Sequence, residues 1–463
     1  MNIKIPSFVI EISPENNLHR KWGHINRYAV SISEKDYRPV PFFYEENEIK
    51  VCILGNPVVK ETINYQLVAK ELVHNYNNNS WLQTIDSEFL FIILNQNIST
   101  LTIITSRFCS PPFYYFYQKD IFIGSFSFFD ITQRLKQLNM FMLRDDSLFE
   151  LISYKRIFGH KTHEKSTVLA SSSSVIVFDG KQVSTHRYWK PSFKKNYSNN
   201  LEENAHNLSF LIQNSIKKKT SDNPRPSLFL SGGMDARTIL AAFNFNKLKC
   251  GLPTCFTIAK FENREVQVAK QLANSIGAQH VYIPFCESDY PKVFTTATKI
   301  TSSMHLPFFM FLGHEKVVSK YADVIFHGHG LDYFFQGKYL PSQSPSILGH
   351  KLNYAKITSL EKERHTLDDY FLKNIPYRIL FKDPSTTSLF INSKFNDYYE
   401  KTKEDVRITL AEAQELSDSL YDQYEYLTFY NFTRHYSFPD HWTMNTNLPQ
   451  RTISFDNDIY QFY

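Results

Sequence analysis

The segment "LFLSGGMDART", residues 228–238, places two adjacent glycines and an aspartate between an apolar run and an expected helix. Only 14 of the 463 residues are glycine, so the pair is unusual in this chain. Backbone N–H groups at a helix N-terminus suit phosphate, and glycines let the backbone approach the anion. Ser231 adds a hydroxyl donor, and Asp235 beside an anion indicates a bridging Mg²⁺. An ordinary turn between a strand and a helix, capped by Ser231 and Asp235, is the alternative interpretation.

Strands and helices alternate on both sides of this turn. Asn200 and Glu203 form a capping-box pattern ahead of a helix with apolar residues at helical spacing. The alternation predicts a parallel α/β sheet, in which ligands bind at the carboxyl ends of the strands. Beyond about Asn353 the chain is expected to be helical and rich in aromatic residues. The expected strands are "PSLFL" (226–230), "TCFTIAKF" (254–261) and "HVYIPF" (280–285), and the expected helices are "ARTILAAFNF" (236–245) and "NREVQVAKQLANSIG" (263–277).

The first 190 residues have a different texture, with β-rich runs joined by short turns. Residues 88–108, 111–127 and 173–189 each contain two such runs, and Asp179-Gly180 is a strong hairpin dipeptide. These segments predict an antiparallel α+β part over residues 1–190. The polar stretch "KPSFKKNYSNN" (190–200) is expected to link it to the α/β part over residues 200–463.

Composition excludes several kinds of partner. The 51 basic residues barely outnumber the 46 acidic ones, so no nucleic-acid partner is expected, and Lys217, Lys218 and Lys219 are expected to be a solvated helix end. The five cysteines are scattered and odd in number, which indicates a reducing, cytoplasmic location. No apolar run is long enough to span a membrane.

The glycine-rich turn resembles the SGGxDS loop of ATP pyrophosphatases (the PP-loop), specifically that of the asparagine synthetase superfamily. A second segment, "VIFHGHGLDYFFQGKYL" (324–340), resembles the superfamily's SGEGSDE…FGGY segment. Residues 256–280 and "QRTISFDNDIYQF" (450–462) resemble further family segments, with Arg451 and Asp456 retained. The residues of the second segment that match the pattern are Gly328, Gly330, Asp332, Phe335 and Gly337.

The resemblance implies an ATP site in a Rossmann-like PP-loop domain. Asp235 and Asp332 would hold Mg²⁺ on the ATP phosphates. Ala236 stands where the family has serine, and the neighbouring Arg237 either compensates for the lost hydroxyl or forms a salt bridge on the helix. His327 and His329 are not expected to bind zinc, because a third ligand at recognisable spacing is missing. The positions implied to contact ATP are Leu230, Ser231, Gly232, Gly233, Asp235, Thr257, Ile258, Gly328 and Gly330.

The N-terminal part resembles the class II glutaminase domain, an αββα-type (Ntn-like) fold, in residues 88–117 and 158–189. That domain uses an N-terminal cysteine, whereas this chain has Asn2 and its first cysteine is Cys52. We therefore expect no glutaminase activity, as in β-lactam synthetases and lasso-peptide cyclases. The family also continues past the segment of Asp456 to a functional lysine. Either another lysine (Lys316, Lys320 or Lys338) takes that role, or the chain is a truncated or degenerate copy.

The chemistry implied is the formation of an amide in two steps. A carboxylate would attack the α-phosphate of Mg·ATP to give an acyl-adenylate and pyrophosphate, and ammonia or a substrate amine would then displace AMP. The carboxylate could belong to a small molecule such as aspartate, to a sugar acid or to a peptide. A non-catalytic family member acting as a binding or scaffold protein is the alternative.

Overall fold

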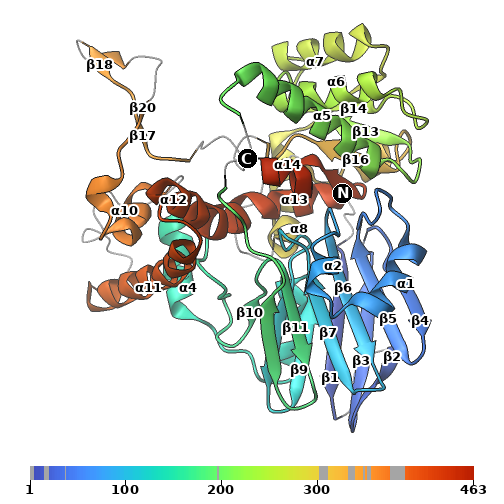
Figure 1. Ribbon diagram of the computed structural model, residues 1–463, viewed down its shortest axis with the longest axis vertical. Coiled ribbons are helices and arrows are strands. Elements are labelled where there is room, and N and C mark those ends of the chain that lie inside the picture. Colours follow the sequence, from blue (N-terminus) through green and yellow to red (C-terminus); the bar gives the residue numbers. More distant parts are fainter. Residues whose placement is uncertain are drawn as a thin grey trace.

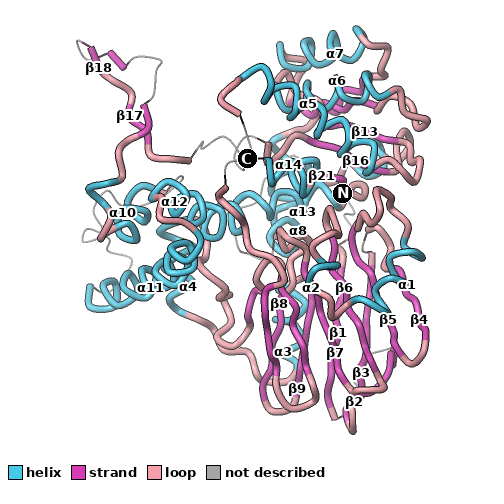
Figure 2. Tube along the Cα trace, viewed as in Figure 1, coloured by secondary structure: helices cyan, strands magenta, loops and turns pink. Residues whose placement is uncertain are grey.

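The computed structural model describes residues 5–14, 20–36, 38–194, 198–301, 311–331, 339–347, 350–351, 356–375 and 392–462. Figure 1 shows three regions: antiparallel sheets from the N-terminal part, a parallel sheet covered by helices, and a group of helices beside them. Figure 2 shows that strands dominate the first region and helices the third. The expected fold class, an antiparallel N-terminal part followed by a parallel α/β part, is confirmed.

Two six-stranded antiparallel sheets form the N-terminal part. Their strand orders are β10-β8-β9-β1-β3-β2 and β12-β11-β7-β6-β5-β4. The sheets pack face to face through buried side chains from both, such as Ile10 and Ile92. Their strands are β1 (Ser7–Ser13), β2 (Arg20–Ile25), β3 (Tyr28–Lys35), β4 (Phe42–Glu46), β5 (Ile49–Gly55), β6 (Phe89–Asn95), β7 (Thr100–Thr105), β8 (Tyr114–Gln118), β9 (Ile121–Ser125), β10 (Val168–Leu169), β11 (Ser174–Phe178) and β12 (Val183–Arg187).

Helices cover the outer faces of this sandwich. Leu72 of α1 (Tyr65–Asn75) packs against strands of one sheet, and Ile131 of α3 (Phe128–Gln137) packs against the other. The arrangement is therefore the αββα layering that was expected. Two further helices of this part are α2 (Asn79–Leu82) and α4 (Asp145–Tyr154).

The three predicted hairpins are confirmed. β6 pairs with β7, β8 with β9, and β11 with β12, all antiparallel. In the last turn the Asp179 carboxylate accepts hydrogen bonds from the Lys181 N–H (2.8 Å) and the Gln182 N–H (2.9 Å). Gly180 there has a φ of 89°, a conformation that glycine adopts without strain.

A five-stranded parallel sheet in the order β15-β14-β13-β16-β21 forms the core of the second part. Three of its strands, β13, β14 and β15, are the strands expected from the sequence. The fifth, β21, was not predicted, because three residues carry no periodicity of their own. The elements are α5 (Leu201–Lys219), β13 (Pro226–Phe229), α6 (Met234–Asn246), β14 (Thr254–Ala259), α7 (Arg264–Ser275), β15 (His280–Pro284), α8 (Tyr290–Ile300), α9 (Glu315–Val318), β16 (Val324–His327) and β21 (Gln450–Thr452).

Helices dominate the described residues beyond 356, as expected, although β21 interrupts them. The π-helical segment η5 (Phe429–Ser437) continues α12 (Leu420–Thr428) into α13 (Phe438–Asn445). The other helices are α10 (Leu367–Asn374), α11 (Asn392–Leu416) and α14 (Asn457–Phe462), with short 3-10 turns at Glu287–Asp289, Glu361–Glu363 and Ile453–Phe455. Two small ribbons pair β17 (Ser342–Gln343) with β20 (Lys356–Ile357) and β18 (Ser346–Ile347) with β19 (His350–Lys351).

The end of α5 docks on the N-terminal part, so the expectation of a solvated lysine run is wrong for two of its members. Lys218 and Lys219 are only 7% and 0% exposed. The Lys219 ammonium donates to the Ser87 hydroxyl (2.8 Å), and the Lys218 ammonium pairs with Asp458 (2.5 Å). A run of lysines in a sequence cannot reveal that a folded neighbour covers it.

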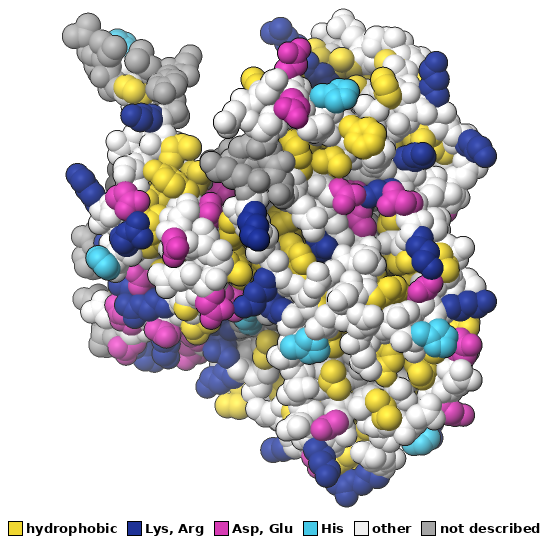
Figure 3. All heavy atoms as spheres, viewed as in Figure 1, with side chains coloured by type: hydrophobic (Ala, Val, Ile, Leu, Met, Phe, Trp, Pro, Cys, Tyr) yellow, Lys and Arg dark blue, Asp and Glu magenta, His cyan; other side chains and the backbone are white. Residues whose placement is uncertain are grey.

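Three general features bear on the protein's surroundings. Among the helices that the structure describes, none has the length and hydrophobicity needed to cross a bilayer. The five cysteines are all free thiols. On the face drawn in Figure 3, basic and acidic side chains are interspersed.

Candidate functional site

The parallel sheet reverses its strand order between β13 and β16, which lie side by side at its centre. The chain leaves β13 toward β14 on one side, whereas β16 lies on the other. Loops that follow two such strands diverge and open a crevice at the carboxyl edge of the sheet. The two glycine-containing segments are these loops.

The first loop connects β13 to α6, and its last residue, Gly233, is exposed. The Leu230 N–H donates to the Phe256 carbonyl (2.9 Å), which holds the start of the loop in the sheet. The Gly233 N–H donates to the Ser231 hydroxyl (3.1 Å), and Gly233 precedes α6 in an extended conformation. A Cβ atom built on Gly232 would meet nothing closer than Val268 Cγ1, at 3.5 Å. A methyl group at Gly232 would therefore make an ordinary van der Waals contact with Val268, at the N-terminus of a thirteen-residue helix.

The second loop packs directly against the first. A Cβ atom on Gly328 would lie 2.6 Å from Asp235 Cβ, 3.0 Å from the Asp235 carbonyl carbon and 3.1 Å from the Ala236 nitrogen. Only glycine fits at this contact, since three atoms of α6 occupy the space of a side chain. Gly330 has a φ of 101°, so its turn also favours glycine. Asp332, the other expected metal ligand, lies outside the described residues, as do Phe335 and Gly337.

Arg237 extends from the first turn of α6 and is exposed. Its Nε donates to the Gly233 carbonyl at 3.3 Å. This contact holds the guanidinium at the N-terminal end of its own helix, beside the loop. Its proposed compensation for the missing serine hydroxyl stays a prediction.

Thr257 and Ile258, expected near the adenine, are buried in the sheet at 5% and 9% exposure. The Thr257 hydroxyl donates to the Leu230 carbonyl (2.7 Å) and lies 2.9 Å from His280 Nε2. Ile258 belongs to an apolar cluster with Ile283. Both side chains thus hold neighbouring strands together, and a contact with adenine stays a prediction.

A third histidine that the sequence did not reveal joins His327 and His329. The His441 ring, from α13, lies 5.0 Å from the His327 ring and 4.2 Å from the His329 ring between centroids. Burial, and then His329, lowers the pKa of His327 to about 3, and burial lowers that of His441 well below its usual value. Within the part of the chain that the structure describes, no three His, Cys, Asp or Glu side chains are arranged to hold a metal. The buried pair His327 and His441 is therefore uncharged and packs behind the second loop.

Two of the candidate lysines lie at the wrong edge of the sheet. The Lys320 carbonyl accepts a hydrogen bond from Arg225 (3.4 Å), the residue that immediately precedes β13. Lys320, and Lys316 in the neighbouring helix α9, therefore lie at the amino edge of the sheet, opposite the crevice. Lys338 is outside the described residues. Lys260 and Arg264, which the sequence analysis did not select, follow β14 at the carboxyl edge.

Arg451 and Asp456 have structural partners. The Arg451 guanidinium forms a two-armed pair with Asp222, at 2.6 and 2.5 Å. The Asp456 carboxylate accepts from the Asp458 N–H (2.9 Å) at the start of α14. Both residues are buried: Arg451 connects β21 to the segment that follows α5, and Asp456 caps the start of α14.

The asparagine synthase family model matches residues 207–462, more than half of the chain and both loops of the crevice. The chain belongs to the asparagine synthase family. Asparagine synthetase [glutamine-hydrolyzing] from Bos taurus is 26% identical over 226 residues, and the Mus musculus protein of the same name is 27% identical over 226. Each alignment covers 45% of this chain and only 38% of the relative. The chain thus spans well under half of the length of these relatives.

Two solved structures overlap with the chain more loosely. The first, titled as the allosteric regulatory enzyme of purine biosynthesis, is 6% identical and covers 60% of this chain and 74% of its own. The second, glutamine phosphoribosylpyrophosphate amidotransferase from B. subtilis, is 8% identical and covers 72% and 71%. Both TM-scores are 0.24, too low to carry any argument about function.

A cavity lies where the N-terminal sheets meet α8, α13 and β21. It encloses about 50 Å³. On its wall the Glu88 carboxylate accepts from the Ser110 hydroxyl (2.6 Å) and the Gln450 amide (3.4 Å). Burial raises the pKa of Glu88. The two cysteines of the N-terminal part, Cys52 and Cys109, are buried instead of lining this cavity, and burial raises the pKa of both thiols.

Proposed function

We propose that this protein is an ATP-dependent ligase that adenylates a carboxylate and transfers ammonia or a substrate amine to it. The observation that carries the proposal is the contact of Gly328 with Asp235. That contact brings two segments far apart in the sequence to one crevice, where a phosphate-binding loop and a metal-binding carboxylate belong in this family. The family membership supports the ligase class, and the substrate stays open.

The residues present fit Mg·ATP. The glycine backbone before α6 and the N-terminus of that helix suit the phosphates, since helix N–H groups attract anions. Ser231, Gly232 and Gly233 would cradle pyrophosphate, with Arg237 near its negative charge. Asp235, with Asp332, would hold Mg²⁺, which neutralises charge on the phosphate oxygens when bound.

The reaction has two steps in this proposal. A carboxylate oxygen forms a bond to the α-phosphorus of ATP, and the bond to the bridging oxygen breaks to release pyrophosphate. An amine nitrogen then attacks the acyl carbon, AMP leaves, and the nitrogen gives up a proton. The chain's contribution is to position the reactants and to neutralise charge.

We infer that the N-terminal part, residues 1–190, does not hydrolyse glutamine. Its two cysteines lie in the core with raised pKa values, so neither offers a thiolate nucleophile. The nitrogen therefore comes from ammonia or from an amine of the substrate, and residues 200–463 carry the chemistry. Five free thiols fit a cytoplasmic location.

A second candidate function, a non-catalytic scaffold, is favoured by one observation. Ala236 is 5% exposed and gives the loop no hydroxyl at the position where the family has serine. The loss of one such hydrogen bond costs about 1–2 kcal/mol, which lowers a rate without abolishing it.

Analysis of the products of ATP separates the two functions. The protein is incubated with Mg·ATP, ammonium and a panel of aspartate, uronic acids and carboxylate-bearing peptides. The ligase predicts pyrophosphate and AMP that depend on one carboxylate, and their loss in Asp235→Asn. Release of ADP would contradict adenylation, and ATP that stays intact across the panel would favour the scaffold.

A further inference from the structure

A hollow separate from the crevice lies between the segment that follows α4 and the helices α11 and η5. It encloses about 250 Å³ and shares no residue with the two glycine loops. A volume of this size is enough for a small organic molecule rather than for one or two waters. Its lining includes the charged or titratable side chains Arg144, His160, Lys165, Asp405, Glu412 and Arg434.

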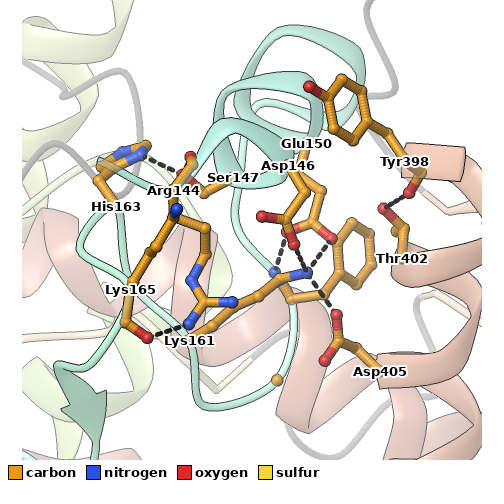
Figure 4. Close-up of polar contacts among 12 residues, drawn as sticks. Arg144, Asp146, Ser147, Glu150, Lys161, His163, Lys165, Tyr398, Thr402 and Asp405 are labelled. Carbon is orange, nitrogen blue, oxygen red and sulfur yellow. Dashed lines mark hydrogen bonds and ion pairs between the residues drawn. The ribbon is translucent and has the colours of Figure 1, made fainter. Parts of the chain in front are cut away.

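The acidic side chains of the hollow are already paired. Figure 4 shows the Lys161 ammonium among three carboxylates. It lies 2.7 Å from Glu150 and 3.3 Å from Asp146, and it also pairs with Asp405. The fourth carboxylate, Glu412, accepts from the Tyr426 hydroxyl at 2.8 Å and lies 3.5 Å from Arg187. Each of these acids is thus in direct contact with a cation. Three of them share the single Lys161 ammonium, and Asp405 also interacts electrostatically with Arg144.

The basic side chains of the hollow lack such partners. Among the described residues, Arg144, Lys165 and Arg434 form no ion pair with a carboxylate. Arg434 is 4% exposed, and its Nη1 atom is buried without a hydrogen-bond partner, while its Nη2 donates to the Ala170 carbonyl (2.6 Å). Arg144 donates through Nη2 to the Lys165 carbonyl, as Figure 4 shows, and its buried Nε has no partner.

A buried guanidinium with an unsatisfied N–H is costly unless a ligand completes its contacts. Arg434 comes from η5, and π-helical segments are rare and often occur at functional sites. Burial, and then the charge of Arg434, lowers the pKa of His160 to about 4, and its ring nitrogens lie 3.1 Å from the Leu169 carbonyl and 3.2 Å from the Ser171 hydroxyl. The hollow thus offers basic side chains that no carboxylate of the described residues contacts directly.

We propose that this hollow binds a small organic anion through a carboxylate or phosphate group, held by Arg144, Lys165 and Arg434. The planar fork of a guanidinium matches both groups, which is why arginine recurs at such sites. The ligand would bridge the N-terminal part and the C-terminal helices, since Arg144 and Lys165 come from the first and Arg434 from the second. This site is independent of the proposed ATP crevice.

Thermal unfolding of the full-length protein tests the proposal. Inorganic phosphate and succinate serve as probes, with sodium chloride at equal ionic strength as the blank. A ligand that binds the folded state raises the melting temperature in a saturable way. We expect such a rise with at least one probe. The probe with the larger effect assigns the group as phosphate or carboxylate.

Variants connect the effect to the hollow. Arg434→Met should weaken binding of the active probe at least about tenfold, because charge-assisted hydrogen bonds are lost. Lys165→Met, at an exposed position, should weaken it severalfold and decides the question if Arg434→Met fails to fold. The matched control Lys70→Met, on α1, should leave it unchanged. The proposal is overturned if neither probe exceeds the chloride blank, or if the effect persists unchanged in Lys165→Met and in any Arg434→Met that folds.

Discussion

Replacing Gly328 with alanine should separate the two loops of the crevice. The new methyl group would lie 2.6 Å from Asp235 Cβ and 3.0 Å from the Asp235 carbonyl carbon, about 1 Å inside normal carbon–carbon contact. Overpacking of this kind costs about 1–3 kcal/mol. Because the obstacle includes backbone at the start of α6, the methyl group cannot be accommodated by a change of side-chain rotamer. We expect a lower melting temperature, by about 2–4 °C for each kcal/mol, and weaker binding of Mg·ATP.

Gly232→Ala is the matched control in the facing loop. Its methyl group would come no closer than 3.5 Å to Val268, so we expect stability within about 0.5 kcal/mol of the unsubstituted protein. Binding of ATP should still weaken, since the methyl group occupies the space assigned to phosphate. Circular dichroism melting gives the stability, and titration calorimetry gives the affinity. The reasoning is refuted if Gly328→Ala melts and binds ATP like the original protein.

Two further predictions concern ionisable groups. Burial, offset by Lys161, raises the pKa of Glu150 from 4.5 to about 7, so the folded state keeps a proton that the unfolded state releases, and stability falls as pH rises through this window. Glu150→Gln should flatten the dependence of the unfolding free energy on pH between 5 and 8, whereas the exposed control Glu361→Gln should not. Equal slopes in the unsubstituted protein and in both variants would be inconsistent with a raised pKa of Glu150. Iodoacetamide at pH 8 should modify Cys286 well before the buried Cys52 and Cys109. Cys286 is exposed, and the Ser288 hydroxyl lowers the pKa of its thiol. If mass spectrometry finds Cys52 or Cys109 modified first, the inference that the N-terminal part has no glutaminase nucleophile is contradicted.

The sequence predicted those parts of the fold whose signals are local. Hairpin dipeptides such as Asp179-Gly180 and the alternation around residues 226–285 act over a few residues, and the structure follows them. The strand β21 could not be predicted, because its three residues become a strand only by pairing with β16. The docking of Lys218 likewise depends on Asp458, a residue far away in the chain.

The same distinction applies to the candidate site. The glycine pair could be selected because two adjacent glycines stand out in a chain with only 14, and the Gly328 contact explains why the second motif has glycine there. His441 was missed, since nothing near it in the sequence relates it to His329. The candidate lysines were chosen by closeness in sequence to the site. Lys316 and Lys320 precede β16, however, and residues that precede a parallel strand lie at the edge opposite its ligand site.

The central claim is that Asp235 and the facing loop form a site for Mg·ATP. Titration calorimetry with α,β-methylene-ATP, with and without Mg²⁺, measures it directly on the full-length protein and on Asp235→Asn. The account predicts one binding site per chain that requires Mg²⁺ and is weakened at least about tenfold in the variant, as loss of a charged metal ligand implies. Failure of the unsubstituted protein to bind, or equal affinity in Asp235→Asn, would contradict it.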